Sequence, residues 1–160
     1  MVRTITSLHN PIVKNLVKLR QRRARDQQHL MLIDGARALR LALHNAFPVT
    51  TIYFAEDVAY IHADLLQRAR VTGVALQEVS AAVFHKIGYG DNPDGVLGVA
   101  TQPGAELTAL PARGVPLYVV TEGLEKPGNL GAILRSADAA GVTGIIVCDS
   151  QTDIWNPNVV

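Results

Sequence analysis

The chain has few of the features that mark secreted, membrane-spanning or metal-cluster proteins. Its 160 residues contain a single cysteine, Cys148, which excludes an intramolecular disulfide framework and a thiolate metal cluster. No run approaches the roughly 20 consecutive apolar residues that a spanning helix needs. The opening residues, Met1-Val2-Arg3-Thr4, lack the basic-then-apolar layout of a secretory signal. We therefore expect a cytoplasmic protein with no membrane attachment and no bound metal.

The overall composition is that of an ordinary globular protein, but its charge is unevenly distributed. Apolar residues make up 48% and charged residues 18% of the chain, and the net charge is only +1. Residues 1–40 carry a net charge of +7, whereas residues 41–160 carry −6. A basic N-terminal part on an acidic body indicates a polyanionic partner, and phosphate backbones are the commonest of these.

The pattern over residues 10–25 predicts one helix with a basic face. Asn10 suits the N-cap, and Pro11 suits the first helical position because its missing N–H would be unpaired there. Surface helices usually mix charges of both signs, which favours a phosphate-contacting face over a merely solubilising one. The residues expected to contact the phosphates of this partner are the basic residues of this helix and one residue beyond it: Lys14, Lys18, Arg20, Arg22, Arg23, Arg25 and Arg37.

Alternating strand and helix patterns follow and indicate an α/β domain. Short apolar or β-branched runs separated by helical stretches predict a mostly parallel or mixed sheet covered by helices. The expected strands are 30–33, 49–55, 74–79 and 96–101, and the expected helices are 36–45, 60–71 and 80–86, with Asp34 as the cap of the first. We expect a first domain of residues 1–101 and a proline- and glycine-bearing linker of residues 102–116.

Residues 117–160 predict the beginning of a second domain. A strand over 117–121, a helix over 129–140 and a strand over 144–149 form one right-handed βαβ unit. Two parallel strands and one helix cannot cover both faces of a sheet. We therefore expect this chain to be the front part of a longer protein, or its last segment to complete a fold with another chain.

A glycine-bearing turn after the first of these strands carries the strongest local motif. Asn129 is placed to cap the following helix, whose N-terminus offers N–H groups to an anion. Arg135 lies in the same helix, and its side chain is expected to point back toward that end. The two predict a phosphate or ribose site. A dinucleotide-binding fingerprint is a weaker alternative, because Lys126 stands where its first glycine should be.

The motif closely resembles the first motif of the SpoU (TrmH-like) branch of the SPOUT RNA methyltransferases. The resembling run is Asn129-Leu130-Gly131-Ala132-Ile133-Leu134-Arg135-Ser136-Ala137, with Ala140-Gly141-Val142 behind it. The front half resembles the L30e-like substrate-binding domain found in many of these enzymes. The residues that carry this second resemblance are Ser7-Leu8-His9-Asn10-Pro11, Leu32-Ile33-Asp34-Gly35 and Asp91-Asn92-Pro93-Asp94-Gly95-Val96.

The resemblance implies transfer of a methyl group from S-adenosylmethionine to a ribose 2′-hydroxyl of ribosomal or transfer RNA. Asn129 and Arg135 match the family's active-site Asn and Arg. The family's cofactor motifs are expected beyond Val160, so this chain alone is expected neither to bind S-adenosylmethionine nor to be active. Family members generally dimerise, so a homodimer is expected for the full-length protein. A non-catalytic RNA-binding module is the alternative.

Overall fold

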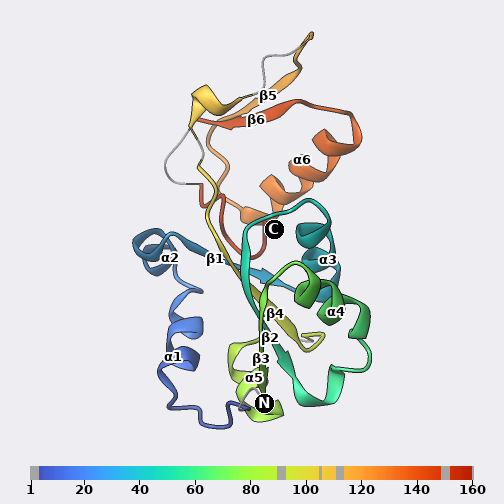
Figure 1. Cartoon of the computed structure of the whole chain (residues 1–160). Coiled ribbons are helices and arrows are strands. Elements are labelled where there is room, and N and C mark those ends of the chain that lie inside the picture. The colour runs from blue at the N-terminus through green and yellow to red at the C-terminus, as the bar shows by residue number, and fades with distance from the viewer. Residues whose placement is uncertain (1–3, 90–92, 105, 111–113, 149–151, 160) are drawn as a thin grey trace. The chain divides into compact units, whose positions relative to one another are not determined.

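The computed structural model describes residues 4–89, 93–104, 106–110, 114–148 and 152–159. The chain divides into two compact units, Met1–Gln102 and Pro103–Val160, and each has a sheet of its own (Figure 1). Asp91 and Asn92, which carry part of the family resemblance, lie outside the described residues. Within the described part of the chain, every helix falls short of the length and apolar character that crossing a bilayer requires.

The first unit is built on a mixed four-stranded sheet. Its strands are β1 (Leu30–Asp34), β2 (Val49–Ala55), β3 (Ala75–Val79) and β4 (Val96–Thr101). Their order is β1-β4-β2-β3, with β2 and β3 parallel and β4 antiparallel to both of its neighbours. Strand β4, the last of this unit in the sequence, is therefore an inner strand between β1 and β2, and its first five residues are buried. The α/β class and all four expected strands are confirmed.

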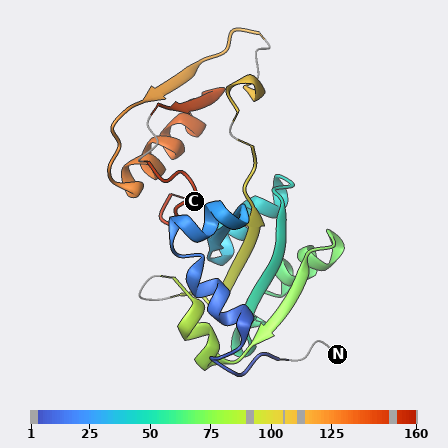
Figure 2. The ribbon, with the colours of Figure 1, turned by 90° about the vertical axis from the view of Figure 1, so that its left-hand side faces the viewer.

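Helices cover both faces of this sheet. The helices that follow β1, β2 and β3 are α3 (Ala36–His44), α4 (Ala63–Val71) and α5 (Ala81–Ile87). Figure 2 shows α1 and α5 on one side of the sheet and α4 on the other. On the α3 side, a Cβ at Gly98 of β4 would lie 2.4 Å from Leu39 Cδ2, so only glycine lets α3 pack this closely on the central strand.

The predicted single helix over residues 10–25 is wrong, because two helices occupy this region. They are α1 (Pro11–Lys18) and α2 (Arg22–Gln28). Asn10 caps α1 as expected, since its Oδ1 accepts a hydrogen bond from Ile12 N at 2.9 Å. The chain leaves the helical conformation at Gln21, whose φ and ψ are −91° and 131°. The basic residues therefore do not form a single stripe along one helix.

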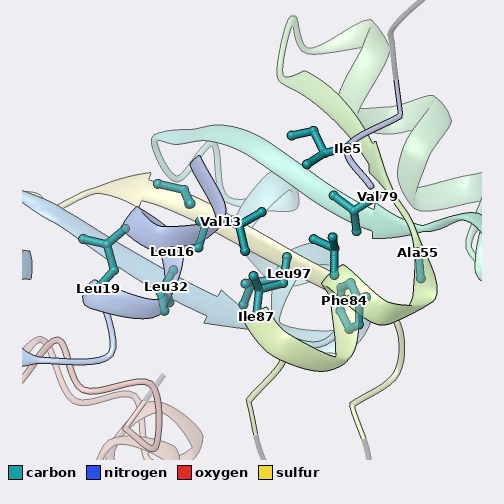
Figure 3. Packing of buried hydrophobic residues seen from close by; sticks show 12 residues of the cluster. Ile5, Val13, Leu16, Leu19, Leu32, Ala55, Val79, Phe84, Ile87 and Leu97 are labelled. Carbon is teal, nitrogen blue, oxygen red and sulfur yellow. The ribbon is translucent and has the colours of Figure 1, made fainter. Parts of the chain in front are cut away.

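The main core of the first unit lies between the sheet and the helices α1 and α5. Figure 3 shows Val13 and Leu16 of α1 facing Leu32 of β1, with Leu97 of the central strand behind Ile87. All five of these side chains are at most 2% exposed. Since burying one such side chain contributes about 1.5–3 kcal/mol, this cluster is a main source of the unit's stability.

The second unit is a βαβ arrangement. Strands β5 (Tyr118–Thr121) and β6 (Gly144–Val147) are parallel neighbours, with α6 (Pro127–Ala139) between them in the chain. Residues 102–116, expected to be a linker, contain the short 3-10 helix η2 (Leu107–Ala109). A Cβ at Gly144 would lie 2.8 Å from Leu110 Cδ2, so the segment after η2 packs directly on β6.

Candidate functional site

The β5–α6 turn and the first turns of α6 form the candidate reaction site. Thr121 is buried at the end of β5, and Gly123 turns the chain with φ at +68°. The helix begins at Pro127, whose fixed φ suits the first helical position. The expectation that Asn129 caps this helix is wrong. Asn129 lies within the first turn, and its backbone N–H donates to Lys126 O at 3.0 Å.

Residues 152–159 lie against this turn and the start of α6. Thr152 is buried, and its hydroxyl donates to Leu124 O at 2.8 Å. Further along, the backbone of Val159 comes so close to the helix that a Cβ on Gly131 would lie 3.1 Å from Val159 O. Glycine at position 131 therefore permits this close approach. The sequence motif contained Gly131, but its spacing did not indicate which segment packs there.

Arg135 extends from the next turn of α6 back over Gly131. Its Nη1 is 3.4 Å from the position that a Cβ on Gly131 would occupy. The guanidinium therefore points toward the helix N-terminus, as the usual direction of helical side chains predicts. Asn129 and Arg135 are both exposed, but six residues of helix set them about 120° apart around the axis. Their convergence on one ligand stays a prediction.

The N-cap residue of α6 leaves the N-terminus of this helix without a side-chain cap of its own. Lys126 occupies the N-cap position, and it makes no side-chain capping bond. A lysine ammonium has only donors, so it cannot accept from the helix N–H groups. The end of α6 thus combines the positive pole of a 13-residue helix with a lysine and the side chain of Arg135. This arrangement favours an anion.

Five of the seven basic residues expected to contact RNA are exposed, and two are not. The exposed residues are Lys14, Lys18, Arg22, Arg23 and Arg37. Arg22 Nε lies 3.4 Å from Asp26 Oδ2 in an exposed ion pair, which offsets part of its charge. The other two residues, Arg20 and Arg25, are engaged with the protein itself.

Arg25 is fully buried, which contradicts its assignment to the RNA-binding surface. Its Nη1 donates to Leu19 O and to Arg20 O, at 2.8 Å each. These carbonyls follow the end of α1, where helical partners are lacking. The guanidinium therefore links α2 to the end of α1. It supplies hydrogen-bond donors to carbonyls that backbone N–H groups would bind if the helix continued, as the sequence pattern predicted.

Arg20 is half-buried and holds the segment that follows α5. Its Nη2 donates to Lys86 O at 3.0 Å and also to Gly88 O, and its guanidinium carbon lies 5.9 Å from the centre of the Tyr89 ring. A guanidinium over an aromatic face is a favourable cation–π contact. Arg20 therefore contributes to the structure of this loop, in contrast to the purely RNA-facing role expected from the sequence.

The sequence predicts Asp34 as the cap of α3, and this prediction is wrong. The side chain that caps α3 belongs to Asp94. Asp94 Oδ2 accepts from Ala36 N at 2.7 Å, and Asp94 O lies 2.9 Å from His62 Nε2. Burial raises the pKa of Asp34, while a hydrogen bond from the Tyr89 backbone opposes the shift. The two carboxylates lie near each other in space, although they are distant in the chain. No local pattern could have identified this long-range cap.

Two family descriptions match the chain, one in each unit. Residues 10–98 match the MRM3-like substrate binding domain, and residues 116–160 match the SpoU rRNA Methylase family. An uncharacterized tRNA/rRNA methyltransferase of Synechocystis is 35% identical over 99% of the chain. The 23S rRNA (guanosine-2′-O)-methyltransferase RlmP of Bacillus subtilis is 29% identical over 97% of it. The chain spans 57% and 58% of the lengths of these two relatives.

Solved structures agree with these matches. An AdoMet-bound rRNA methyltransferase from Sinorhizobium meliloti superposes with a TM-score of 0.83 at 31% identity, covering 99% of this chain and 59% of that one. The SpoU methyltransferase AviRb from Streptomyces viridochromogenes, also in complex with AdoMet, gives a TM-score of 0.81 at 26% identity, covering 94% of this chain and 57% of that one. The resemblance drawn from the sequence is confirmed. The chain belongs to the SpoU rRNA methylase family, with an MRM3-like substrate-binding domain over residues 10–98 and SpoU methylase sequence over residues 116–160.

Proposed function

We propose that this chain carries the RNA-binding domain and part of the reaction site of an S-adenosylmethionine-dependent RNA 2′-O-ribose methyltransferase. The observation that carries the proposal is the start of α6, where Arg135 reaches back over Gly131 toward a helix end whose N-cap residue, Lys126, makes no side-chain capping bond. An uncapped helix N-terminus beside a guanidinium favours a phosphate or an oxyanion. Relatives named as 2′-O-methyltransferases support the same reaction.

Arg135 and Asn129 would act on the RNA and not on the methyl donor. A guanidinium stays protonated in proteins, so Arg135 serves as a cation and not as a base. It holds a phosphate next to the target ribose and stabilises the negative charge that develops on the 2′-oxygen as its proton passes to water and the oxygen takes the methyl group. The amide of Asn129 orients the ribose. S-adenosylmethionine supplies the methyl group from its sulfonium, and no residue of this chain is assigned to binding it.

The RNA substrate is proposed to lie on the exposed basic residues of the first unit. Lys14 and Lys18 of α1, Arg22 and Arg23 of α2 and Arg37 of α3 would contact its phosphates. We also propose a division into a substrate-binding domain of residues 1–101 and a catalytic part that begins at residue 117. A non-catalytic RNA-binding module would use the same basic surface.

Methyl transfer from labelled S-adenosylmethionine to ribosomal or transfer RNA tests the proposal. We expect the whole gene product that contains this chain to incorporate label, and Arg135→Ala to lower the rate by about 10²–10³-fold. Ser136→Ala is the matched control, because Ser136 is an exposed neighbour on the same helix. Full activity of Arg135→Ala would contradict the assignment. RNA binding without any incorporation would support the non-catalytic module.

The assembly state, cofactor affinity and compartment are part of the same proposal. We expect a cytoplasmic homodimer, and exposed apolar side chains at Val115, Leu117 and Val120 of the second unit support an association surface there. Light scattering on the gene product measures the subunit number. Calorimetry with the 160-residue chain is expected to detect no micromolar affinity for S-adenosylmethionine.

A further inference from the structure

A groove of about 400 Å³ opens in the first unit between α1 and the sheet. Ile12 and Asn15 form its helix side, and Thr51 and Tyr53 of β2 form its sheet side. The volume lies within the range of about 300–1,000 Å³ that is usual for small-ligand sites. The candidate reaction site contributes no residue to this groove, because it belongs to the other unit.

The groove exists because the helices on this face stop short of part of β2. Alternate residues of a strand share a face, so Thr51, Tyr53 and Ala55 point to the same side of the sheet. Ala55 belongs to the buried cluster under α1 and α5, whereas Thr51 and Tyr53 are only half-buried. Since α1 is only eight residues long, it leaves these two side chains beside an open slot.

The walls combine apolar surface with a few polar groups. Ile12 is 42% exposed beside the buried Leu16 and Val99. The amide of Asn15 exchanges two hydrogen bonds with Gln28, at 2.9 Å and 3.1 Å. The Tyr53 hydroxyl has no hydrogen-bond partner among the described residues, and burial raises its pKa. A ligand with an apolar face and a polar edge matches these walls.

The rim of the groove on the α1 side is cationic. Residues three apart lie on one ridge of a helix, so Lys14 stands next to Pro11 and Lys18 next to Asn15, both of which line the groove. Both lysines are exposed, and neither pairs with a carboxylate within the described part of the chain. An apolar peptide would gain little from these charges, whereas a nucleotide places a phosphate beside its base.

We propose that this groove binds an unpaired nucleobase of the RNA substrate. The base stacks on the Tyr53 ring, its polar edge meets the Thr51 hydroxyl, and its flanking phosphates meet Lys14 and Lys18. Proteins recognise unpaired RNA bases through this combination of aromatic stacking and edge contacts. The inference rests on RNA being the substrate of the proposed function, and it assigns to the first unit a preference for unpaired over paired RNA.

Binding of two RNA probes to the 160-residue chain tests this inference. Fluorescence anisotropy compares a short labelled single strand with the duplex of the same length. We expect Tyr53→Leu to weaken single-strand binding by about 5- to 100-fold, the usual range for a lost base–aromatic stack, and to leave duplex binding unchanged. Tyr53→Phe keeps the ring and is expected to bind like the wild type. Tyr60→Leu is the matched control, since Tyr60 is 79% exposed and lies outside the groove.

A second variant keeps the test decisive if Tyr53→Leu fails to fold. Thr51→Leu narrows the groove from a half-buried strand position and removes the hydroxyl without adding an aromatic ring, so it should also lower single-strand affinity. Unchanged single-strand affinity in folded Tyr53→Leu or Thr51→Leu, or equal losses for single strand and duplex, would overturn the groove assignment. So would a wild-type chain that binds no single strand. The methyl-incorporation assay decides the proposed function separately, because its outcome depends on Arg135 and not on Tyr53.

Discussion

Arg25 illustrates that a basic residue counted toward a binding surface can belong to the core. It is one of six positive charges between residues 14 and 25, and its sequence context resembles that of its neighbours. Its side chain is nevertheless 0% exposed and donates to two carbonyls at the end of α1. The charge pattern predicted a positively charged surface in this region. It could not show that Arg25 is buried whereas Arg22 and Arg23 are exposed. The distinction depends on where the helix breaks.

Replacing Arg25 by methionine should therefore destabilise the fold without a specific effect on RNA. Methionine keeps an apolar stem but leaves the carbonyls of Leu19 and Arg20 without their donor. We expect the free energy of unfolding to fall by about 2 kcal/mol, since bonds to a charged donor contribute about 1.5–3 kcal/mol each and relief of the buried charge offsets part of the loss. Urea unfolding of the 160-residue chain measures this change.

Arg23→Met provides the opposite pattern as a control. Arg23 is exposed, so its replacement should change stability by no more than about 0.5 kcal/mol but should weaken RNA binding. Arg25→Met with wild-type stability and the same loss of RNA affinity as Arg23→Met would mean that Arg25 does contact RNA.

The reaction-site residues show a comparable limit. The types and spacing of Asn129 and Arg135 identified the motif, and the backward direction of Arg135 followed from general helix geometry. The sequence pattern predicts a helix start at residue 129, two residues too late, because Asn129 is a residue type that favours the N-cap whereas Pro127 is the first helical residue. The packing of Val159 on Gly131 could not be predicted, since it joins segments 28 residues apart.

At the level of elements, local patterns predicted the strands well and their order not at all. Runs of apolar and β-branched residues identified β1 to β4 almost to the residue. The central position of β4 depends on its pairing with β1, in which Leu30 faces Thr101. Such long-range pairing leaves no trace in a local pattern. The sequence pattern also gives no sign of the break between α1 and α2, because no glycine or proline marks Leu19–Gln21.

The two exposed lysines of α1 lead to a prediction about how RNA affinity depends on salt concentration. Reversing the charges of Lys14 and Lys18 to glutamate should weaken RNA binding, and the slope of log affinity against log salt should fall by about two, one per lost phosphate contact. Arg68→Glu with Arg70→Glu makes the same charge change on α4, where both residues are exposed. This control should leave the slope nearly unchanged. Equal effects of the two pairs would show a response to net charge alone.

For the whole molecule, the two units differ in how well each covers its own sheet. The first has four strands with helices on both faces and a buried core of its own. The second has two parallel strands and one long helix, with Val120 of β5 62% exposed. Parallel strands are normally buried on both faces. The positive charge concentrated in residues 1–40 also belongs entirely to the first unit.

This difference predicts that residues 1–102 fold and bind RNA without the rest of the chain. Their hydrophobic cluster and all four strands lie within this range, so removing residues 103–160 breaks no strand pairing. We expect a cooperative thermal transition by circular dichroism and single-strand affinity within about twofold of that of the whole chain, since the phosphate contacts are local to this unit. Residues 103–160 alone should show no cooperative transition, because two strands rarely form a stable sheet. A non-cooperative melt of residues 1–102, beside a cooperative one for the 160-residue chain, would mean that the substrate-binding unit depends on the second unit for its structure.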